Sequence, residues 1–263
     1  MNYRREELSD SVAITMQSIP AGSFLMGSPE TELNRSVNEG PLHSVNLEAF
    51  ELSTTVVTQA QWAEIASWPK VNQELDLDPS GCKGSNRPVE RVTWDEAVEF
   101  CARLSAYTSK SYTLPSEAQW EYACRAGTTK PYNFGLTGCD QITPQDCNLG
   151  IYTYNYAEEA WVNPNPEVGS FPANAWGLYD MHGNVWEWCL DDWHSSYYGA
   201  PEDGAAWLKP TNSISDHKWK VVRGGVWKAK DVFDRILDGR SAFRVPSMAE
   251  WKRVSVSFRV CCN

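Results

Sequence analysis

Residues 128–263, the second half of the chain, show almost no helical periodicity, and this limits the fold more than any other feature. Short aromatic and β-branched runs alternate there with Gly, Pro, Asn and Asp, the residues that favour turns. A compact domain rarely contains so long a loop-rich stretch unless its loops carry function or are held by metal ions. We therefore expect short strands joined by long, functional loops.

Two main helices are predicted in the first half, each with a clear start. Thr93 precedes residues 94–108, whose apolar positions recur at three- and four-residue steps, and Ser116 precedes residues 117–126. In both, Ser or Thr is followed three residues later by Glu or Gln, the pattern of a capping box. A shorter helix with the same kind of start is predicted over residues 59–67.

Strands are predicted on both sides of these helices. Residues 12–28 alternate apolar and polar side chains around Pro20–Gly22, which predicts a β-hairpin with its turn there. Residues 43–57 predict two further strands, and residues 67–91 a long loop. The chain is therefore expected to be α+β, with two main helices, short strands and a high loop content.

Composition excludes several classes of partner. Lys and Arg total 23 and Asp and Glu total 34, a net charge of −11, so no nucleic-acid partner is expected. No apolar run approaches the roughly 18 residues of a transmembrane helix, and no signal peptide is visible, so we expect a cytoplasmic protein without membrane contacts. No linker divides the sequence, which favours a single domain over residues 1–263 with a flexible stretch at residues 1–11.

The eight cysteines favour reduced, structural thiols. They show no C-x-x-C spacing, and His is too scarce nearby for an ordinary zinc site. Cys101 and Cys124 fall within predicted helices, where a free Cys packs as a small hydrophobic residue. Without a signal peptide, disulfides are not expected. A bond between Cys139 and Cys147 across a loop stays open as an alternative.

Six blocks occur in order along nearly the whole chain. They are IPAGSFLMGS (19–28), RPVERVTWDEAVEFCARLS (87–105), YTLPSEAQWEYACRAGT (112–128), GLYDMHGNVWEW (177–188), VVRGG (221–225) and SFRV (257–260). Together they resemble the formylglycine-generating-enzyme, or sulfatase-modifying factor, family. The resemblance implies a C-type-lectin-like fold with two helices, little regular secondary structure and bound calcium.

The block at residues 177–188 is the candidate calcium site. Asp180 and Glu187 place two carboxylates around a Gly-containing turn, and Ca²⁺ takes about six to eight oxygen ligands from carboxylates and carbonyls. The resemblance implies that Asp180, the Gly183 and Val185 carbonyls and Glu187 hold a structural Ca²⁺ ion. The alternative is a turn in which the carboxylates accept backbone N–H bonds.

Two other metal assignments are weaker. The family's second calcium site matches Asn148 and Leu149, but its later Asp has no clear counterpart, and Glu158 or Glu159 would have to replace it. His182 has no second His or Cys at ligand spacing, so we expect it at the surface or beside a site rather than on a transition metal.

Copper chemistry is not expected. Oxidases of this family hold copper with two cysteines, four and nine residues after the second glycine of the R-G-G block, because Cu(I) prefers sulfur. Those positions here are Ala229 and Asp234, and Cys261 and Cys262 lie too far along the chain to replace them. The adjacent acids Asp191 and Asp192 are expected to be exposed loop carboxylates, with a general acid–base pair as the alternative.

Residues 226–256, which we call the ligand segment, occupy the place of the family's substrate face. Aromatic, Met and Arg side chains, which are enriched in interface cores, are frequent there. The candidate ligand-binding residues are Trp227, Lys228, Lys230, Asp231, Phe233, Asp234, Phe243, Val245, Ser247, Met248, Trp251 and Arg253. The alternative is that about half of the apolar ones belong to the core.

A second resemblance bears on the same segment. Proteins diversified by retroelements, several of them cyanobacterial, share this fold and vary residues between an RGG-x-W block and a terminal F-R-V strand, around R-S-A-x-R. Those landmarks are residues 223–227, 240–244 and 258–260 here. The expected function is a non-catalytic module that binds a protein or peptide ligand, and the alternative is an oxidase or accessory enzyme acting on a protein substrate. The oligomeric state stays open.

Overall fold

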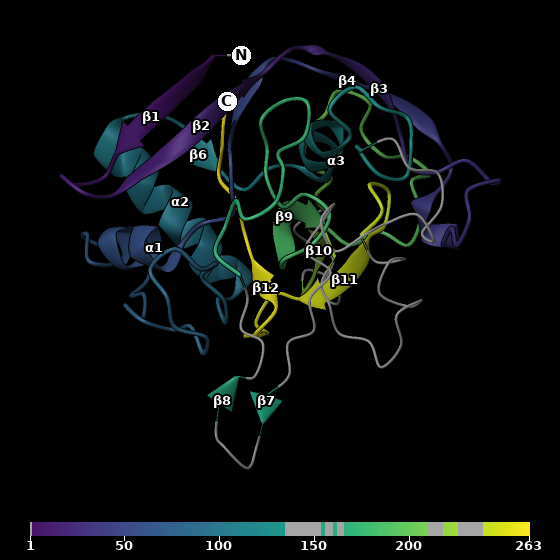
Figure 1. Cartoon of the computed structure of the whole chain (residues 1–263). Helices are drawn as coiled ribbons and strands as arrows, with labels where there is room; N and C mark the ends of the chain where they lie inside the picture. The colour runs from purple at the N-terminus through teal and green to yellow at the C-terminus, as the bar shows by residue number, and fades with distance from the viewer. Residues whose placement is uncertain (1, 135–153, 156–159, 162–165, 210–217, 226–238) are drawn as a thin grey trace.

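The computed structural model confirms an α+β chain (Figure 1). It describes residues 2–134, 154–155, 160–161, 166–209, 218–225 and 239–263. In this described part, no helix is long and apolar enough to cross a membrane.

All three predicted helices are present and begin at their predicted caps. They are α1 (Gln59–Ala66), α2 (Trp94–Thr108) and α3 (Glu117–Arg125). The side chains of Thr58, Thr93 and Ser116 each accept the N–H three residues later, and that residue's side chain accepts the cap's own N–H. These reciprocal bonds satisfy backbone donors that a helix start leaves unpaired. In Figure 1, α1 and α2 lie side by side and α3 lies apart from them.

A five-stranded sheet joins both ends of the described chain in the order β1-β2-β5-β13-β6. Its strands are β1 (Tyr3–Glu7), β2 (Ala13–Ile19), β5 (Phe50–Ser53), β6 (Tyr112–Thr113) and β13 (Cys261–Cys262). The stretch expected to be flexible therefore contains a strand, because all five residues of β1 pair with β2.

The predicted hairpin at residues 12–28 is wrong in its pairing. Both strands form, but β2 has β1 on one side and β5 on the other, so it has no free edge for β3. Strand β3 (Gly22–Met26) pairs instead with β4 (His43–Leu47). The Pro20–Ala21 connection thus carries the chain from one sheet to another.

A four-stranded sheet, in the order β11-β10-β9-β12, contains two strands from the described end of the ligand segment, β11 and the start of β12. Its strands are β9 (Trp186–Asp192), β10 (Trp219–Arg223), β11 (Val245–Met248) and β12 (Val256–Ser257). A separate short pair consists of β7 (Tyr154–Asn155) and β8 (Ala160–Trp161). The described residues of 67–91 form the predicted long loop, without helix or strand.

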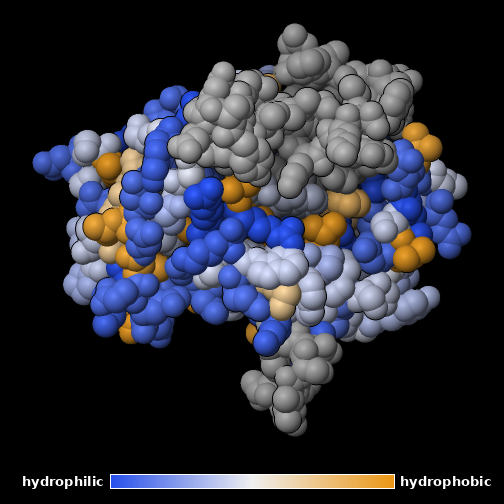
Figure 2. Space-filling model, turned by 90° about the horizontal axis from the view of Figure 1, so that it is seen from below, coloured by the Kyte–Doolittle hydropathy of each residue, from blue (hydrophilic) through white to orange (hydrophobic). Residues whose placement is uncertain are grey.

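Aromatic side chains fill the core between α1, α2 and the sheets. The Trp62 and Phe100 rings stack at 5.7 Å between centroids, and Phe258 meets Phe100 edge-on at 5.2 Å. The six cysteines of the described part are all buried, and Cys101 and Cys124 lie within helices, as predicted; the set is Cys82, Cys101, Cys124, Cys189, Cys261 and Cys262. On the face in Figure 2, the described hydrophobic residues occur in small groups among hydrophilic ones.

Candidate functional site

Three buried arginines hold the chain on either side of residues 226–238, which lie outside the described residues. Arg223 ends β10, just before Gly225, whereas Arg240 and Arg244 follow Gly239. Their exposed fractions are only 0–2%. Charged side chains are rarely so buried unless they are paired, so the partners of these arginines define the site.

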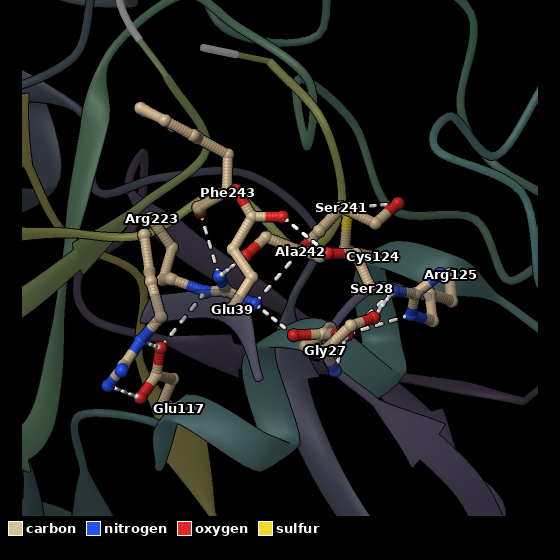
Figure 3. Close-up of polar contacts among 12 residues, drawn as sticks. Gly27, Ser28, Glu39, Glu117, Cys124, Arg125, Arg223, Ser241, Ala242 and Phe243 are labelled. Atoms are coloured by element: carbon tan, nitrogen blue, oxygen red, sulfur yellow. Dashed lines mark hydrogen bonds and ion pairs between the residues drawn. The ribbon is translucent and has the colours of Figure 1, made fainter. Parts of the chain in front are cut away.

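Arg223 joins the end of β10 to residues 241–243 (Figure 3). Its Nη1 donates to the carbonyl oxygens of Ala242 and Phe243 at 2.8 and 2.7 Å, and its Nη2 to that of Ser241 at 2.9 Å. It also forms an ion pair with Glu121 of α3. Because Arg223 binds the backbone carbonyls of residues 241–243, these hydrogen bonds do not depend on the side chains of those residues.

Arg244 joins β11 to the start of α3. Its Nε and Nη2 donate to the two carboxylate oxygens of Glu117, both at 2.7 Å, and its guanidinium lies 4.4 Å from the ring centres of Trp193 and Tyr197. Burial alone would raise the pKa of Glu117, but Arg244 and Arg223 hold that pKa below its ordinary value. The pair is therefore fully charged at neutral pH.

Arg240 joins the same region to the loop at residues 29–42. Its Nη1 lies 2.6 Å from Glu32 Oε1 and 2.8 Å from Glu39 Oε2, and its Nη2 lies 2.6 Å from Glu39 Oε1. Nη2 also donates to the Asn34 carbonyl at 3.0 Å. Removing one partner of such a buried pair costs roughly 3–5 kcal/mol. The residues that flank 226–238 on both sides are thus held by buried ion pairs and hydrogen bonds of Arg223, Arg240 and Arg244.

The structure divides the described candidate ligand residues between two places. Phe243 is half-buried and lies near the three buried arginines, with its ring 5.7 Å from the Arg240 guanidinium. Trp251, which is 37% exposed, lies beyond the other end of β11, edge-on to Trp219 at 5.8 Å. Arg253 is exposed and its guanidinium lies 4.2 Å from the centre of the Trp251 ring.

Other candidates are less available or are not described. Val245 packs against the core, Met248 is half-buried and Ser247 is only 1% exposed. Outside the described residues lie Trp227, Lys228, Ala229, Lys230, Asp231, Phe233 and Asp234, as do Cys139, Cys147, Asn148, Leu149, Glu158 and Glu159. Part of the ligand segment therefore belongs to the core, as the alternative prediction allowed.

The candidate calcium residues retain open oxygen positions. Asp180 Oδ2 accepts the Gly169 N–H at 2.8 Å, whereas the buried Oδ1 has no hydrogen-bond partner of ordinary geometry in the described structure. Glu187 accepts two bonds from Arg259, at 2.6 and 2.7 Å, and one from Trp120 at 2.7 Å. A carboxylate has about four lone-pair sites, so one remains on Glu187. The open oxygen of Asp180 is compatible with a cation, whereas Arg259 already balances the charge of Glu187, and calcium binding stays a prediction.

His182 is buried, at 4% exposed, so the expected place at the surface is wrong, and the place beside a site stays a prediction. Its Nδ1 lies 2.7 Å from the Gly239 carbonyl oxygen, and its Nε2 accepts the Asn133 N–H at 3.0 Å. Burial lowers the pKa of His182 to about 4, so the ring is neutral at pH 7 and its proton sits on Nδ1. Nδ1 thus holds Gly239, at the end of residues 226–238, and Nε2 holds Asn133.

Asp191 and Asp192 are also buried, at 4% and 2% exposed, because β9 extends through them. Asp191 accepts the N–H groups of Glu117 and Trp207 at 2.7 and 2.8 Å, and burial raises its pKa to about 7. Asp192 pairs with Lys220 Nζ at 2.7 Å. The expected exposed loop carboxylates are thus structural acceptors that join β9 to its neighbours.

Comparisons with known proteins agree on one family. Residues 6–263 match the family model of the sulfatase-modifying factor enzyme 1-like domain. The formylglycine-generating enzyme of Mycobacterium tuberculosis is 31% identical over 67% of this chain and 73% of its own length. The structure of PvdO from Pseudomonas aeruginosa superposes with a TM-score of 0.78 at 31% identity, over 99% of this chain and 98% of that one.

Treponema denticola variable protein 1 shares the fold, with a TM-score of 0.73 at 22% identity over 99% of this chain and 98% of that one. The match to the family model spans nearly the whole sequence, and the two relatives at 31% identity cover two thirds of it or more. The chain therefore belongs to the sulfatase-modifying factor enzyme 1-like, or formylglycine-generating-enzyme, family.

Proposed function

We propose that this chain is a non-catalytic binding module that holds a protein or peptide ligand on residues 226–256. The observation that carries the proposal is the set of three buried, paired arginines. Arg223, Arg240 and Arg244 secure the backbone on both sides of residues 226–238. A surface supported in this way tolerates changes of its outward side chains, because its position is set by buried groups elsewhere.

Two further observations support binding over catalysis. Ala229 and Asp234 stand where the copper-binding cysteines of family oxidases would stand, and neither supplies sulfur. A protein with the same fold is named as a variable protein, which supports a diversified ligand surface on this scaffold. The net charge of −11 favours a protein or peptide ligand over nucleic acid.

The second candidate function is that of an oxidase or accessory enzyme acting on a protein substrate. It is favoured by the relative named as a formylglycine-generating enzyme. Cys124 is a poor nucleophile for it, because burial raises the pKa of this thiol to about 12. Stoichiometric Cu(I) binding with turnover of a Cys-containing peptide would establish the enzyme and contradict the binding module.

The binding test uses the full chain and an array of short synthetic peptides of graded apolar and charged content. We expect a subset of peptides to bind, and Phe243→Ala and Trp251→Ala to weaken that binding. Tyr107→Ala is the matched control, because Tyr107 is a 62% exposed aromatic residue on α2. If no peptide binds, or if every bound peptide binds the two variants as it binds the wild type, the ligand segment does not have this function.

A further inference from the structure

A cleft of about 400 Å³ lies among segments that are far apart in the sequence. It is lined by residues 47–50, which lead from β4 into β5, by the loop at residues 203–206, by the end of β6, by the start of α3 and by Asn263. None of its lining residues belongs to the ligand segment. Its volume falls within the range of small-molecule sites, roughly 300–1,000 Å³.

Hydrogen bonds fix the loop that forms one side of this cleft. The Glu202 carbonyl accepts the Asn46 N–H of β4 at 2.8 Å, and the Gly204 carbonyl accepts the Ser116 hydroxyl at the start of α3 at 2.7 Å. Gly204 also lies so close to β4 that a Cβ there would meet Leu47 Cγ at 3.0 Å. Because β4 and α3 both hold the loop, the cleft is preformed, as small-molecule sites usually are.

Three of the buried side chains that line the cleft are apolar. Leu47, Phe50 and Leu114 are 6%, 5% and 1% exposed, and Leu190 adds a half-buried apolar side chain. An alkyl chain that left water to contact these side chains would be stabilised by the hydrophobic effect. The cleft therefore favours a ligand with an aliphatic part.

The charged residues that line the cleft have one sign. Glu48 and Asp203 line it and are exposed, whereas no lysine or arginine is among its lining residues. Asp203 Oδ1 accepts the Ala205 N–H at 3.0 Å, and neither acid has an ion-pair partner among the described residues. A cleft lined by one sign of charge attracts ligands of the opposite sign. This cleft therefore favours a cation over a carboxylate or a phosphate.

We propose that the cleft is a second binding site, and that it takes a small aliphatic amine whose ammonium group lies by the two acids and whose alkyl chain lies against the apolar side chains. Lysine side chains divide in the same way, with the stem along apolar surface and the charged head in water. The site does not rest on the proposed function, because it shares no residue with the ligand segment.

The test is calorimetric titration of the full chain with n-pentylamine at neutral pH and low salt. Three probes each remove one feature of this ligand: 1-pentanol lacks the charge, pentanoate reverses it, and methylamine lacks the alkyl chain. We expect n-pentylamine to bind at least about tenfold more tightly than each of them, because charge and alkyl chain both contribute. Its affinity should fall as salt screens the two acids.

Four variants locate the binding. Glu48→Gln and Asp203→Asn should each bind n-pentylamine about fivefold more weakly, since an exposed ion pair contributes little. Ala49→Trp places a large side chain at an exposed lining position and should weaken binding at least about tenfold by filling the cleft. Asp10→Asn is the matched control, because Asp10 is an exposed acid between β1 and β2 that does not line the cleft. Thermal unfolding should show all four variants folded.

The outcomes separate a built site from general attraction to an acidic chain. If Asp10→Asn weakens binding as much as Glu48→Gln does, the net charge of −11 alone attracts the amine and the site is wrong. The site is also wrong if pentanoate binds as well as n-pentylamine, or if a folded Ala49→Trp binds like the wild type. If a blocked lysine peptide binds but n-pentylamine does not, the assignment to a small amine fails. The peptide array with Phe243→Ala tests the proposed function separately, whichever of these results is found.

Discussion

Replacing Arg244 by Met should destabilise the protein strongly, because it leaves the Glu117 carboxylate buried without its main partner. Glu117 is 2% exposed and receives two bonds of 2.7 Å from Arg244. Met has a similar length and fills the space with a flexible apolar side chain, so loss of packing contributes little. The change therefore removes mainly the charge and its hydrogen bonds.

The magnitude follows from what remains around Glu117. Breaking a buried ion pair from one side costs roughly 3–5 kcal/mol. Arg223 Nε stays 3.6 Å from Glu117 Oε1, and the Tyr197 hydroxyl donates to it at 3.1 Å, so we expect about 3 kcal/mol, the lower end of that range. Adding Glu117→Gln removes the stranded charge, and the double variant should recover at least about 1 kcal/mol.

The assay is urea unfolding of the wild type, the single variant and the double variant, compared at constant m-value. The pH dependence gives an independent check. In the wild type Glu117 has a lowered pKa, so its stabilisation is present at neutral pH and is lost as pH falls through that pKa. A single variant that loses less than about 1 kcal/mol, or a double variant less stable than the single one, would refute the assigned role of the pair.

Three further outcomes are expected. Burial raises the pKa of Asp191 to about 7, so this group stabilises the fold below about pH 4 and that contribution is lost as pH rises towards 7. Asp191→Asn should flatten this part of the unfolding free energy measured against pH. Ca²⁺ at a hundred times its Kd should stabilise the chain by about 2.7 kcal/mol in thermal unfolding, and Asp180→Asn, but not the exposed Asp203→Asn, should abolish the effect. A chain that EDTA and Ca²⁺ leave unchanged does not use calcium. The wild type should bind no stoichiometric Cu(I), and Ala229→Cys with Asp234→Cys should create binding, measured with a competing chelator.

Local features of this fold could be predicted from the sequence, because the groups that decide them are neighbours in the chain. The caps of α2 and α3 follow from residues three apart, and the left-handed turn at Ala126 immediately precedes Gly127. The pairing of β2 could not be predicted in the same way. Its partner β5 lies more than thirty residues on, and the alternating pattern of β2 is equally compatible with a local hairpin.

The burial of charged groups could not be predicted from the sequence either, because the partners that bury them lie far away along the chain. Asp191 and Asp192 look exposed in a polar stretch, and only their contacts with Trp207 and Lys220 place them inside. Arg240 meets Glu39 across 201 positions of sequence, which no spacing rule can anticipate. One signal is present in the sequence: the R-S-A-x-R block contains two arginines, Arg240 and Arg244, and both are structural anchors.

The most direct test of the binding module changes only the segment between its two anchored ends. A variant carrying Trp227→Ser, Lys228→Ser, Lys230→Ser and Phe233→Ser keeps Arg223, Arg240 and Arg244. Thermal unfolding and the peptide array are then measured together. We expect a Tm within about 2 °C of the wild type, a difference below roughly 1 kcal/mol, and loss of the wild-type peptide profile. A variant that unfolds, or one that folds and binds the same peptides with the same strength, contradicts the assignment of ligand binding to this segment.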